Sequence, residues 1–586
     1  MKLWIRRDMT WDKILGSVLC LIGMGMLCIS VYLSFSSDIW YDELFTMGLA
    51  NQSCGKLVSI TARDVHPPLY YMIVRLFLGI SGGLKGDIAY QAAVAKLVSI
   101  APFFLCMIYA LTKVRKNFGM LTAGLFCFLL PAMPKLADYT VEVRMYGWAL
   151  FFVTAGMLHA YELAAPRGVC GETSRAGNGR TPESREFARN GGGTGKKRRL
   201  DFAALTLYGL AACYTHYFAC VAFAMIYFYL LIVFMAVHGD KEGRKKEIKS
   251  LFISGICCGA GYLPWLIGAF TVQISQVKEN YWIQPLTWRS LGGCVKFIFQ
   301  FAFSGQTVSM IAGGVLFAVY GEMLLLFLAG ERKTSQADGE TGKLQTGKET
   351  EKGRKADERE LPGRKKVFFL FGCLGVPAGI VFFGFLASIL IRPVFVYRYM
   401  LPALGVFWLA FAIVLGEAKK KKLFFIPAVL FVIVTGIFNY RSFYGEEMWK
   451  RVQMREARQA LSQIGGEDIV IFNFDQTQAV ASCYLNNDTY LWYGKPEKLI
   501  REMYPKNHAL VEGEFSDEEG VRALKELLWA KEGSGKGKVW FFGSGNARDE
   551  IIEKWEKAGI MADEKASVMI ERYWFNIYDC KLKSTE

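Results

Sequence analysis

The stretch from Ser36 to Tyr71 carries the residue types best suited to chemistry. It reads SSDIWYDELFTMGLANQSCGKLVSITARDVHPPLYY and lies between two strongly apolar regions. Carboxylates placed where a chain leaves a bilayer are costly unless they are solvated, paired or used. The adjacent acids Asp42 and Glu43 could supply a general base that takes a proton from an attacking hydroxyl or amine. The structural alternative is that the two acids only cap a surface helix, because acidic residues favour the first turn.

The same stretch ends on Asp64-Val65-His66-Pro67-Pro68. The two prolines fix the backbone angle φ and bias the preceding histidine to an extended conformation. Held in this way, His66 could contact a phosphate, ligate a metal or relay a proton. The alternative is that the prolines start a surface helix and that the histidine packs locally.

Two arginines and a further histidine lie at the same side of the predicted membrane. Arg144 and Arg398 each stand beside or near a tyrosine, in RMY and YRYMLP. A guanidinium group is suited to clamping a phosphate, although arginines at a membrane edge also extend toward lipid head groups. His216, in YTHYF, could meet Asp64 or His66 to bind a divalent metal, and no other cofactor is expected.

The elements that must position these residues are membrane-spanning helices. Hydrophobic residues make up 53% of the 586 residues, in repeated apolar runs of the length that crosses a bilayer. The net charge of +16 comes from basic residues in short loops between these runs, which fits membrane orientation and excludes nucleic-acid binding. We expect eleven spans, at about 14–35, 91–112, 118–136, 141–163, 201–216, 218–237, 250–270, 308–329, 366–390, 396–416 and 423–438.

The basic loops set the predicted orientation. They place the N-terminus in the cytoplasm and the loop 36–89 outside, with an amphipathic surface helix at about 66–80. A second surface helix is expected before about residue 303. The polar segments 166–200 and 331–365 are predicted to be disordered cytoplasmic loops.

The composition changes near residue 440. We predict a multi-span membrane domain over 1–439 and a small α/β domain over 440–586 that lies outside the membrane. Short apolar runs at 469–474, 489–493 and 539–543 are typical of buried strands, and 518–530 and 548–558 are typical of helices. No complete phosphate-binding or dinucleotide-binding fingerprint is present there.

Five motifs in this order carry a resemblance to a known family: WYDELFTMGLA, DVHPPLYY, RMYGWAL, YTHYF and RYMLPAL. Over residues 14–440 the chain resembles family 39 membrane glycosyltransferases of the GT-C class, which include protein O-mannosyltransferases and lipid A aminoarabinose transferases. The resemblance implies a polyprenyl-phosphate sugar donor, attack at the outer face of the membrane and inversion at the anomeric carbon. By position, Asp42 matches the family's catalytic aspartate. The aminoarabinose transferases have lysine where this chain has His66.

The sequence thus predicts an α-helical polytopic GT-C-like enzyme of the cytoplasmic membrane, a hexosyl- or pentosyltransferase. Asp42 is the expected general base, and His66, Arg144 and Arg398 are the expected contacts of the donor phosphate. Glu43 and Asp64 are expected to position the acceptor or the loop. The acceptor could be a lipid, a protein or a cell-wall glycan. The alternatives are a transporter or flippase of lipid-linked sugars, and a polymerase or ligase that moves whole glycans.

Overall fold

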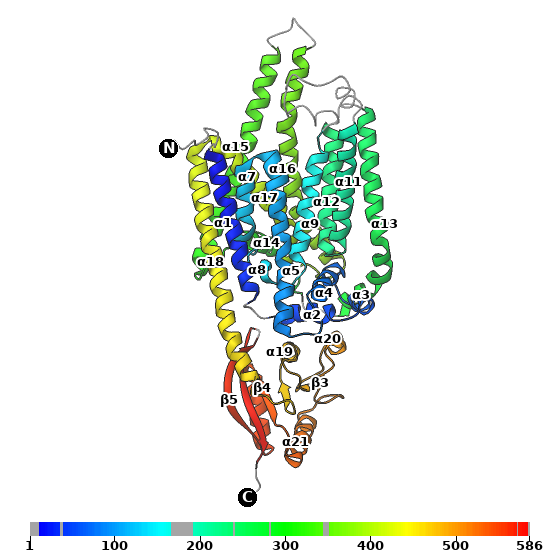
Figure 1. The fold of residues 1–586 in the computed structure, drawn as a ribbon, viewed down its shortest axis with the longest axis vertical. Helices are drawn as coiled ribbons and strands as arrows, with labels where there is room; N and C mark the ends of the chain where they lie inside the picture. The colour runs from blue at the N-terminus through cyan, green and yellow to red at the C-terminus, as the bar shows by residue number, and fades with distance from the viewer. Residues whose placement is uncertain are drawn as a thin grey trace.

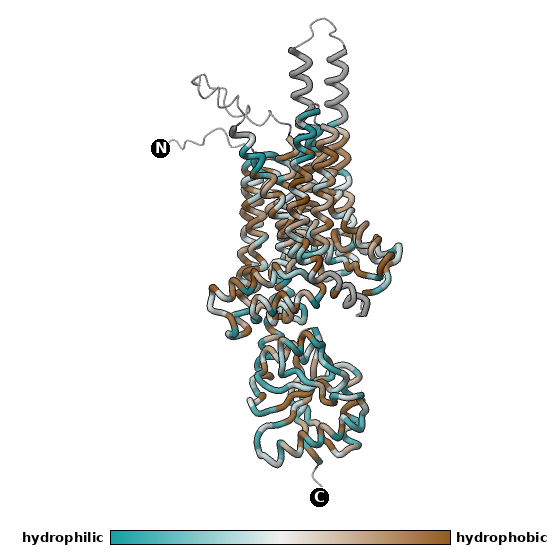
Figure 2. Tube along the Cα trace, turned by 90° about the vertical axis from the view of Figure 1, so that its right-hand side faces the viewer, coloured by the Kyte–Doolittle hydropathy of each residue, from teal (hydrophilic) through white to brown (hydrophobic). Residues whose placement is uncertain are grey.

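A helical bundle and a smaller sheet domain make up the chain (Figure 1). The computed structural model describes residues 11–35, 39–165, 192–237, 241–279, 283–343, 351–570 and 572–583. The bundle is built from long apolar helices, and hydrophobic residues recur along most of its length (Figure 2). This arrangement confirms the predicted class, a polytopic helical membrane protein with a C-terminal α/β domain.

Helices match the eleven predicted spans. Within the described ranges, eight continuous helices are long and apolar enough to cross a membrane. In chain order they comprise α1 (Trp11–Ser34), α5 (Ile88–Tyr109) continued by a π-helical turn η1 (Ala110–Val114) and α6 (Arg115–Phe118), α12 (Tyr217–Val237), α13 (Lys241–Glu279), α15 (Gln306–Lys343), α16 (Glu351–Leu390), α17 (Leu401–Glu417) extended by two 3-10 turns η2 (Tyr397–Met400) and η3 (Ala418–Lys420), and α18 (Lys422–Leu461).

The other three predicted spans are helices that are shorter or more polar. They are α7 (Met120–Ala132), α9 (Tyr146–Leu163) and α11 (Gly192–Cys213). Nearly every residue of α7 and α9 is buried inside the bundle. Because these two helices face protein more than lipid, they need less length and less hydrophobicity than an exposed span.

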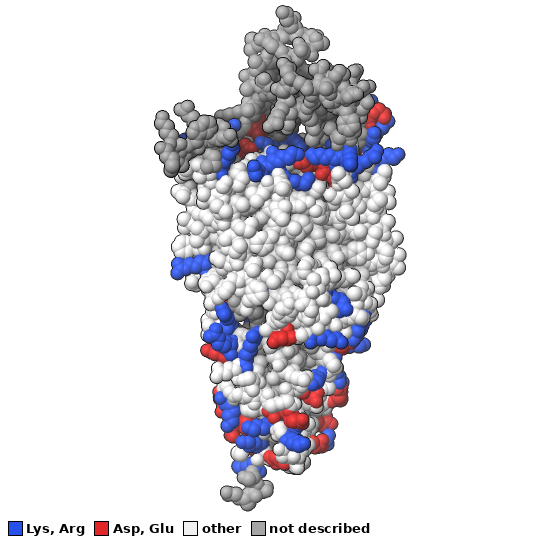
Figure 3. Space-filling model, viewed as in Figure 1, with Lys and Arg blue, Asp and Glu red and all other residues white. Residues whose placement is uncertain are grey.

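The two ends of the bundle differ in charge. Figure 3 shows a belt of Lys and Arg at one end, where Lys419 pairs with Asp12 at the start of α1, and below it a wide band almost free of charge. We call this the basic end. The opposite end, the site end, holds short helices: α2 (Tyr41–Ala50), α3 (Cys54–Arg63), α4 (Leu69–Ile80), α8 (Asp138–Val141) and α14 (Arg289–Phe299). The predicted surface helices correspond to α4 and α14.

The two segments expected to be disordered differ in part from that expectation. Residues 166–191 and 344–350 lie outside the described ranges. Residues 192–200 belong to α11, and 331–343 and 351–365 continue α15 and α16 as helix. The physical reason is local: these stretches are rich in Lys, Arg and Glu, which favour helix when a neighbouring span has already nucleated it.

The C-terminal domain holds a six-stranded sheet in the order β3-β2-β1-β4-β6-β5. The four strands β3, β2, β1 and β4 run parallel, and β6 and β5 add an antiparallel hairpin at one edge. The strands are β1 (Ile469–Phe472), β2 (Thr489–Leu491), β3 (Asn507–Ala509), β4 (Val539–Gly543), β5 (Ile560–Ile570) and β6 (Tyr573–Leu582), and the helices are α19 (Asp475–Ala481), α20 (Lys498–Met503), α21 (Asp517–Ser534) and α22 (Gly545–Lys557).

The last bundle helix connects the two parts. Helix α18 runs without a break through position 440 to Leu461 and packs against β5. The sheet domain is therefore carried at the site end of the bundle, directly beside α2 (Figure 1).

Candidate functional site

The first turn of α2 carries Asp42 between two arginines from distant parts of the chain. Arg398 Nη1 donates to Asp42 Oδ2 at 3.2 Å, and Arg144 Nη2 lies 3.6 Å from the same oxygen. Arg144 Nη1 also donates to the main-chain oxygen of Asp42 at 3.2 Å. Within the described part of the chain, Oδ1 of Asp42 receives no hydrogen bond, so one carboxylate oxygen is fixed and the other is available.

The neighbouring acid, Glu43, is buried and connects the first turn of α2 to the loop before α9. Its Oε1 accepts from Val143 N at 2.6 Å and its Oε2 from Trp40 N at 3.0 Å, and its exposed fraction is 2%. Burial raises the pKa of Glu43 against the opposing effect of Lys96 and these two amides. Because both oxygens are occupied by the backbone, the geometry fits loop positioning better than contact with an acceptor.

Asp64 and His66 form a pair at the end of α3. His66 Nδ1 lies 3.3 Å from Asp64 Oδ2, and Pro67-Pro68 lead directly into α4, as the sequence predicts. Burial is the main cause of the lowered pKa of His66, and the Asp64 carboxylate opposes it. A histidine held through Nδ1 presents Nε2 as its other functional atom.

His216 lies beside this pair but is engaged with its own turn. Its ring centroid is 6.1 Å from that of His66, and its Nδ1 accepts a hydrogen bond from Phe218 N at 3.2 Å. Burial, followed by the charges of His66, Arg144 and Arg398, lowers the pKa of His216 well below its ordinary value. A neutral imidazole is the state that these contacts favour.

The three metal candidates, Asp64, His66 and His216, do not form a complete ligand set. In the part of the chain that the structure describes, no three His, Cys, Asp or Glu side chains converge to hold a metal ion. Asp64 and His66 lie together, whereas His216 already uses one ring nitrogen. The predicted set therefore gives one pair of potential ligands, Asp64 and His66, with the ring of His216 beside it.

Helix α8 and the residue that follows it add two carboxyl groups with unusual surroundings. Burial, followed by the charge of Glu43, raises the pKa of Glu142 to about 8, although Arg144 opposes the shift. Burial likewise raises the pKa of Asp138 to about 6. The sequence alone does not single out these two acids, because an acid between two spans is expected to be solvated until its burial is known.

The C-terminal domain contributes contacts that the sequence does not reveal. Tyr41 OH donates to Glu497 at 2.7 Å, Tyr504 OH donates to the main-chain oxygen of Leu44 at 3.0 Å, and Arg63 lies 3.0 Å from Glu502. These contacts join α20 and its flanks to α2 and α3. No motif predicts them, since they depend on how the two parts of the chain pack.

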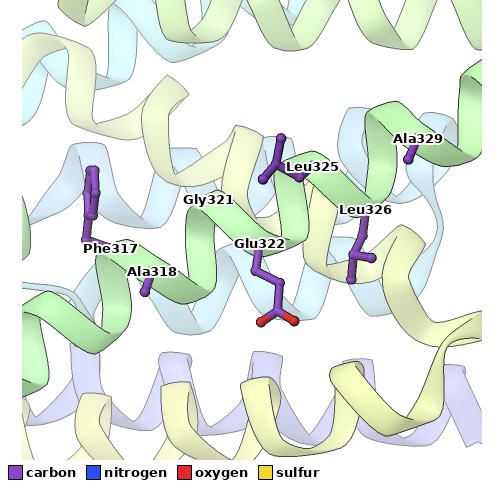
Figure 4. A pocket seen from close by; sticks show the side chains of 7 residues that line it. All are labelled: Phe317, Ala318, Gly321, Glu322, Leu325, Leu326 and Ala329. Carbon is purple, nitrogen blue, oxygen red and sulfur yellow. The ribbon is translucent and has the colours of Figure 1, made fainter.

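A separate groove lies along α15, on the half toward the basic end. It encloses about 570 Å³ and is lined by seven residues of that helix: Phe317, Ala318, Gly321, Glu322, Leu325, Leu326 and Ala329 (Figure 4). Glu322 is the one lining residue with a charge. The groove offers no second reactive group, so the chemistry is assigned to the Asp42 region.

Of the comparisons with known proteins, only the one with solved structures finds matches, and it identifies the fold of the chain. No protein-family model and no curated relative match the chain. Among solved structures, ArnT from Cupriavidus metallidurans in the apo state is similar over 97% of this chain and 99% of its own, at 12% identity and a TM-score of 0.53. The undecaprenyl phosphate-bound ArnT from the same organism follows at 11% identity, covering 96% of this chain and 98% of its own, with a TM-score of 0.47.

A further match is AglB, an oligosaccharyltransferase from Archaeoglobus fulgidus in complex with an inhibitory peptide and a dolichol-phosphate. It covers 91% of this chain and 70% of its own, at 10% identity and a TM-score of 0.41. The match to apo ArnT extends over both the bundle and the C-terminal domain. It confirms the predicted resemblance at the level of the fold: the chain has the GT-C fold of a multi-pass membrane protein.

Proposed function

We propose that this protein is a membrane glycosyltransferase that moves a sugar from a polyprenyl-phosphate donor to a nucleophile at the outer face of the cytoplasmic membrane. The observation that carries the proposal is the meeting of Asp42 with Arg144 and Arg398, from three separate segments, at one end of a GT-C bundle. ArnT, which shares this fold, is known in a complex with undecaprenyl phosphate.

The chemistry follows from the two oxygens of Asp42. Oδ2 is held by the arginines, and Oδ1 can accept the proton of an acceptor hydroxyl or amine as it attacks the anomeric carbon. Attack opposite to the departing phosphate inverts the configuration. The bond from the sugar to the phosphate oxygen breaks, and its electrons stay on that oxygen.

The arginines also suit the leaving group. A departing phosphate needs preorganised donors, and a guanidinium carries five N–H groups, of which Asp42 occupies only some. Arg144 and Arg398 can therefore contact the base and the phosphate at the same time. His66 Nε2 can supply a further contact, while Glu43 and Asp64 hold the loop.

The orientation is part of the proposal. The basic belt of Figure 3 fits the cytoplasmic side by the positive-inside rule, which puts the N-terminus in the cytoplasm and the site end outside. Residues 440–586 would then form an extracytoplasmic domain beside the acceptor, and residues 1–439 the transferase domain. A pentose, a hexose, and lipid, protein or glycan acceptors all remain compatible with this site.

The test uses purified protein in detergent and a panel of polyprenyl-phosphate donors that carry different pentoses and hexoses. Release of free polyprenyl phosphate from at least one donor, dependent on an added acceptor, is expected. Movement of an intact lipid-linked sugar across a vesicle membrane without release would contradict the proposal and favour a flippase.

A further inference from the structure

Three polar atoms in the neighbourhood of Arg144 are buried and have no hydrogen-bond partner in the described part of the chain. They are the hydroxyl oxygens of Tyr71 and Tyr146 and Nε of Arg144. The exposed fractions of the three side chains are 0%, 1% and 5%. Because an unpaired buried polar group costs free energy, each such group in a native fold calls for an explanation.

These atoms belong to one cluster. The Arg144 guanidinium carbon lies 6.0 Å from the ring centroid of Tyr146, and the phenol of Tyr71 is close enough to Arg144 to be influenced by its charge. They come from α4, from the loop before α9 and from the first residue of α9. Three elements thus bring unpaired N–H and O–H groups to the place where Arg144 holds Asp42.

Tyr70 shows that burial alone does not explain the unpaired hydroxyls. It is adjacent to Tyr71 and equally buried, but its hydroxyl pairs with Ser99 Oγ at 2.8 Å. The fold can therefore satisfy a tyrosine hydroxyl in this region, and does so one residue away.

The chemistry of the cluster fits an oxyanion. Two phenolic O–H groups and a guanidinium N–H can all donate, and charge-assisted hydrogen bonds to an anionic oxygen are the strong ones. We infer that Tyr71 and Tyr146 donate hydrogen bonds to the phosphate of the donor lipid as it departs. This inference rests on the proposed function and assigns two residues to its leaving-group site.

Both tyrosines keep their protons throughout the step. The electrons of the sugar–phosphate bond go to the phosphate oxygen, and the proton of the acceptor goes to Asp42. In the structure the three atoms are closed off from solvent, so the phosphate reaches them only after the tyrosine side chains turn toward it. The buried donors then gain the partners that they lack here.

The experiment compares Tyr71→Phe and Tyr146→Phe with the matched control Tyr70→Phe. Two quantities are measured on purified full-length protein: the Kd for farnesyl phosphate, with farnesol as the uncharged reference, and the melting temperature without ligand. We expect the two site variants to bind farnesyl phosphate about ten- to a hundredfold more weakly, with the farnesol Kd unchanged.

The melting temperatures are expected to separate the two site variants from the control. Tyr71→Phe and Tyr146→Phe remove an unpaired hydroxyl, so these variants should melt at the same or a higher temperature than the parent protein. Tyr70→Phe breaks a hydrogen bond and should melt lower, with its farnesyl phosphate Kd unchanged.

Two results would overturn the inference, and only the second would also overturn the proposed donor class. If the parent protein prefers farnesyl phosphate over farnesol and both site variants keep that preference, the tyrosines do not contact the phosphate and the proposed function stands. If the parent protein shows no preference for the phosphate, the donor class fails and the inference fails with it.

Discussion

At the scale of single residues, the site depends on a division of labour between acids that look alike in the sequence. Asp42 shares one oxygen with two arginines, Glu43 gives both oxygens to backbone amides, and Glu142 is half-buried next to them. The hydrogen bonds, nearby charges and burial of each carboxyl group distinguish the three acids, which their positions in the sequence do not.

Arg398 supplies the first residue-scale prediction. Its ion pair with Asp42, at 3.2 Å, is partly exposed and therefore contributes little to the free energy of unfolding. A bound phosphate would contact the same guanidinium group. Arg398→Gln should raise KM for the donor by about ten- to a hundredfold with little loss of melting temperature. Steady-state kinetics on purified protein checks this, with Arg392→Gln, at the end of a neighbouring span, as the comparison.

The pH dependence of stability follows from Glu142. Its pKa in the folded protein is raised to about 8, so between its ordinary value and pH 8 the folded state binds more protons than the unfolded state. Stability should therefore fall as the pH rises through this window, and Asp138, raised to about 6, adds to the lower part. Melting temperatures across pH 5–8.5 test this. Glu142→Gln should flatten the profile, and an unchanged slope would contradict the assignment.

At the scale of elements, the short helices at the site end matter most, and the sequence predicts two of them, α4 and α14. Pro67-Pro68 start α4, and an apolar stretch too short to span becomes that surface helix. The sequence does not predict the hairpin β5–β6. Three consecutive charged residues in the middle of β5, Asp563, Glu564 and Lys565, interrupt the alternation of apolar and polar residues that indicates a strand. The contact of α2 with α20 was missed as well, since it forms only when the two parts of the chain meet.

Gly48 tests that contact between elements. A Cβ at Gly48, on α2, would lie 2.8 Å from Met503 Sδ and 2.9 Å from the ring of Tyr504. Gly48→Ala should therefore destabilise the protein by about 1–3 kcal/mol through overpacking, and Met503→Ala in the same chain should restore part of it. Gly55→Ala is the matched control on α3, because its Cβ would meet nothing within 4 Å. Equal effects of the two glycine changes would contradict the packing described.

At the scale of the whole molecule, periodicity and charge predicted eleven spans, each of which coincides with a helix of the bundle. Eight described helices qualify as spans by length and composition, whereas the interior helices α7 and α9 are short or polar. The site residues Asp42, Arg144 and Arg398 could be named from motif order. Their convergence on one carboxylate could not, because it depends on tertiary packing.

The orientation of the molecule can be checked with a native side chain. Cys54 is exposed at the start of α3, at the site end. If this end faces outward, a membrane-impermeant maleimide should label Cys54 in intact cells, and Cys54→Ser should remove that labelling. Labelling that appears only after the membrane is opened would reverse the proposed orientation.

The most direct test of the central claim is single-turnover release of polyprenyl phosphate by the parent protein and by Asp42→Asn. Asn keeps the size of the side chain and removes its basicity, and Asp87→Asn, at the cap of α5, serves as the control. We expect Asp42→Asn to slow release by about a hundred- to ten-thousandfold at unchanged abundance and melting temperature, while the control retains its rate. Release by Asp42→Asn at the parent rate would contradict the assignment of Asp42 as the base.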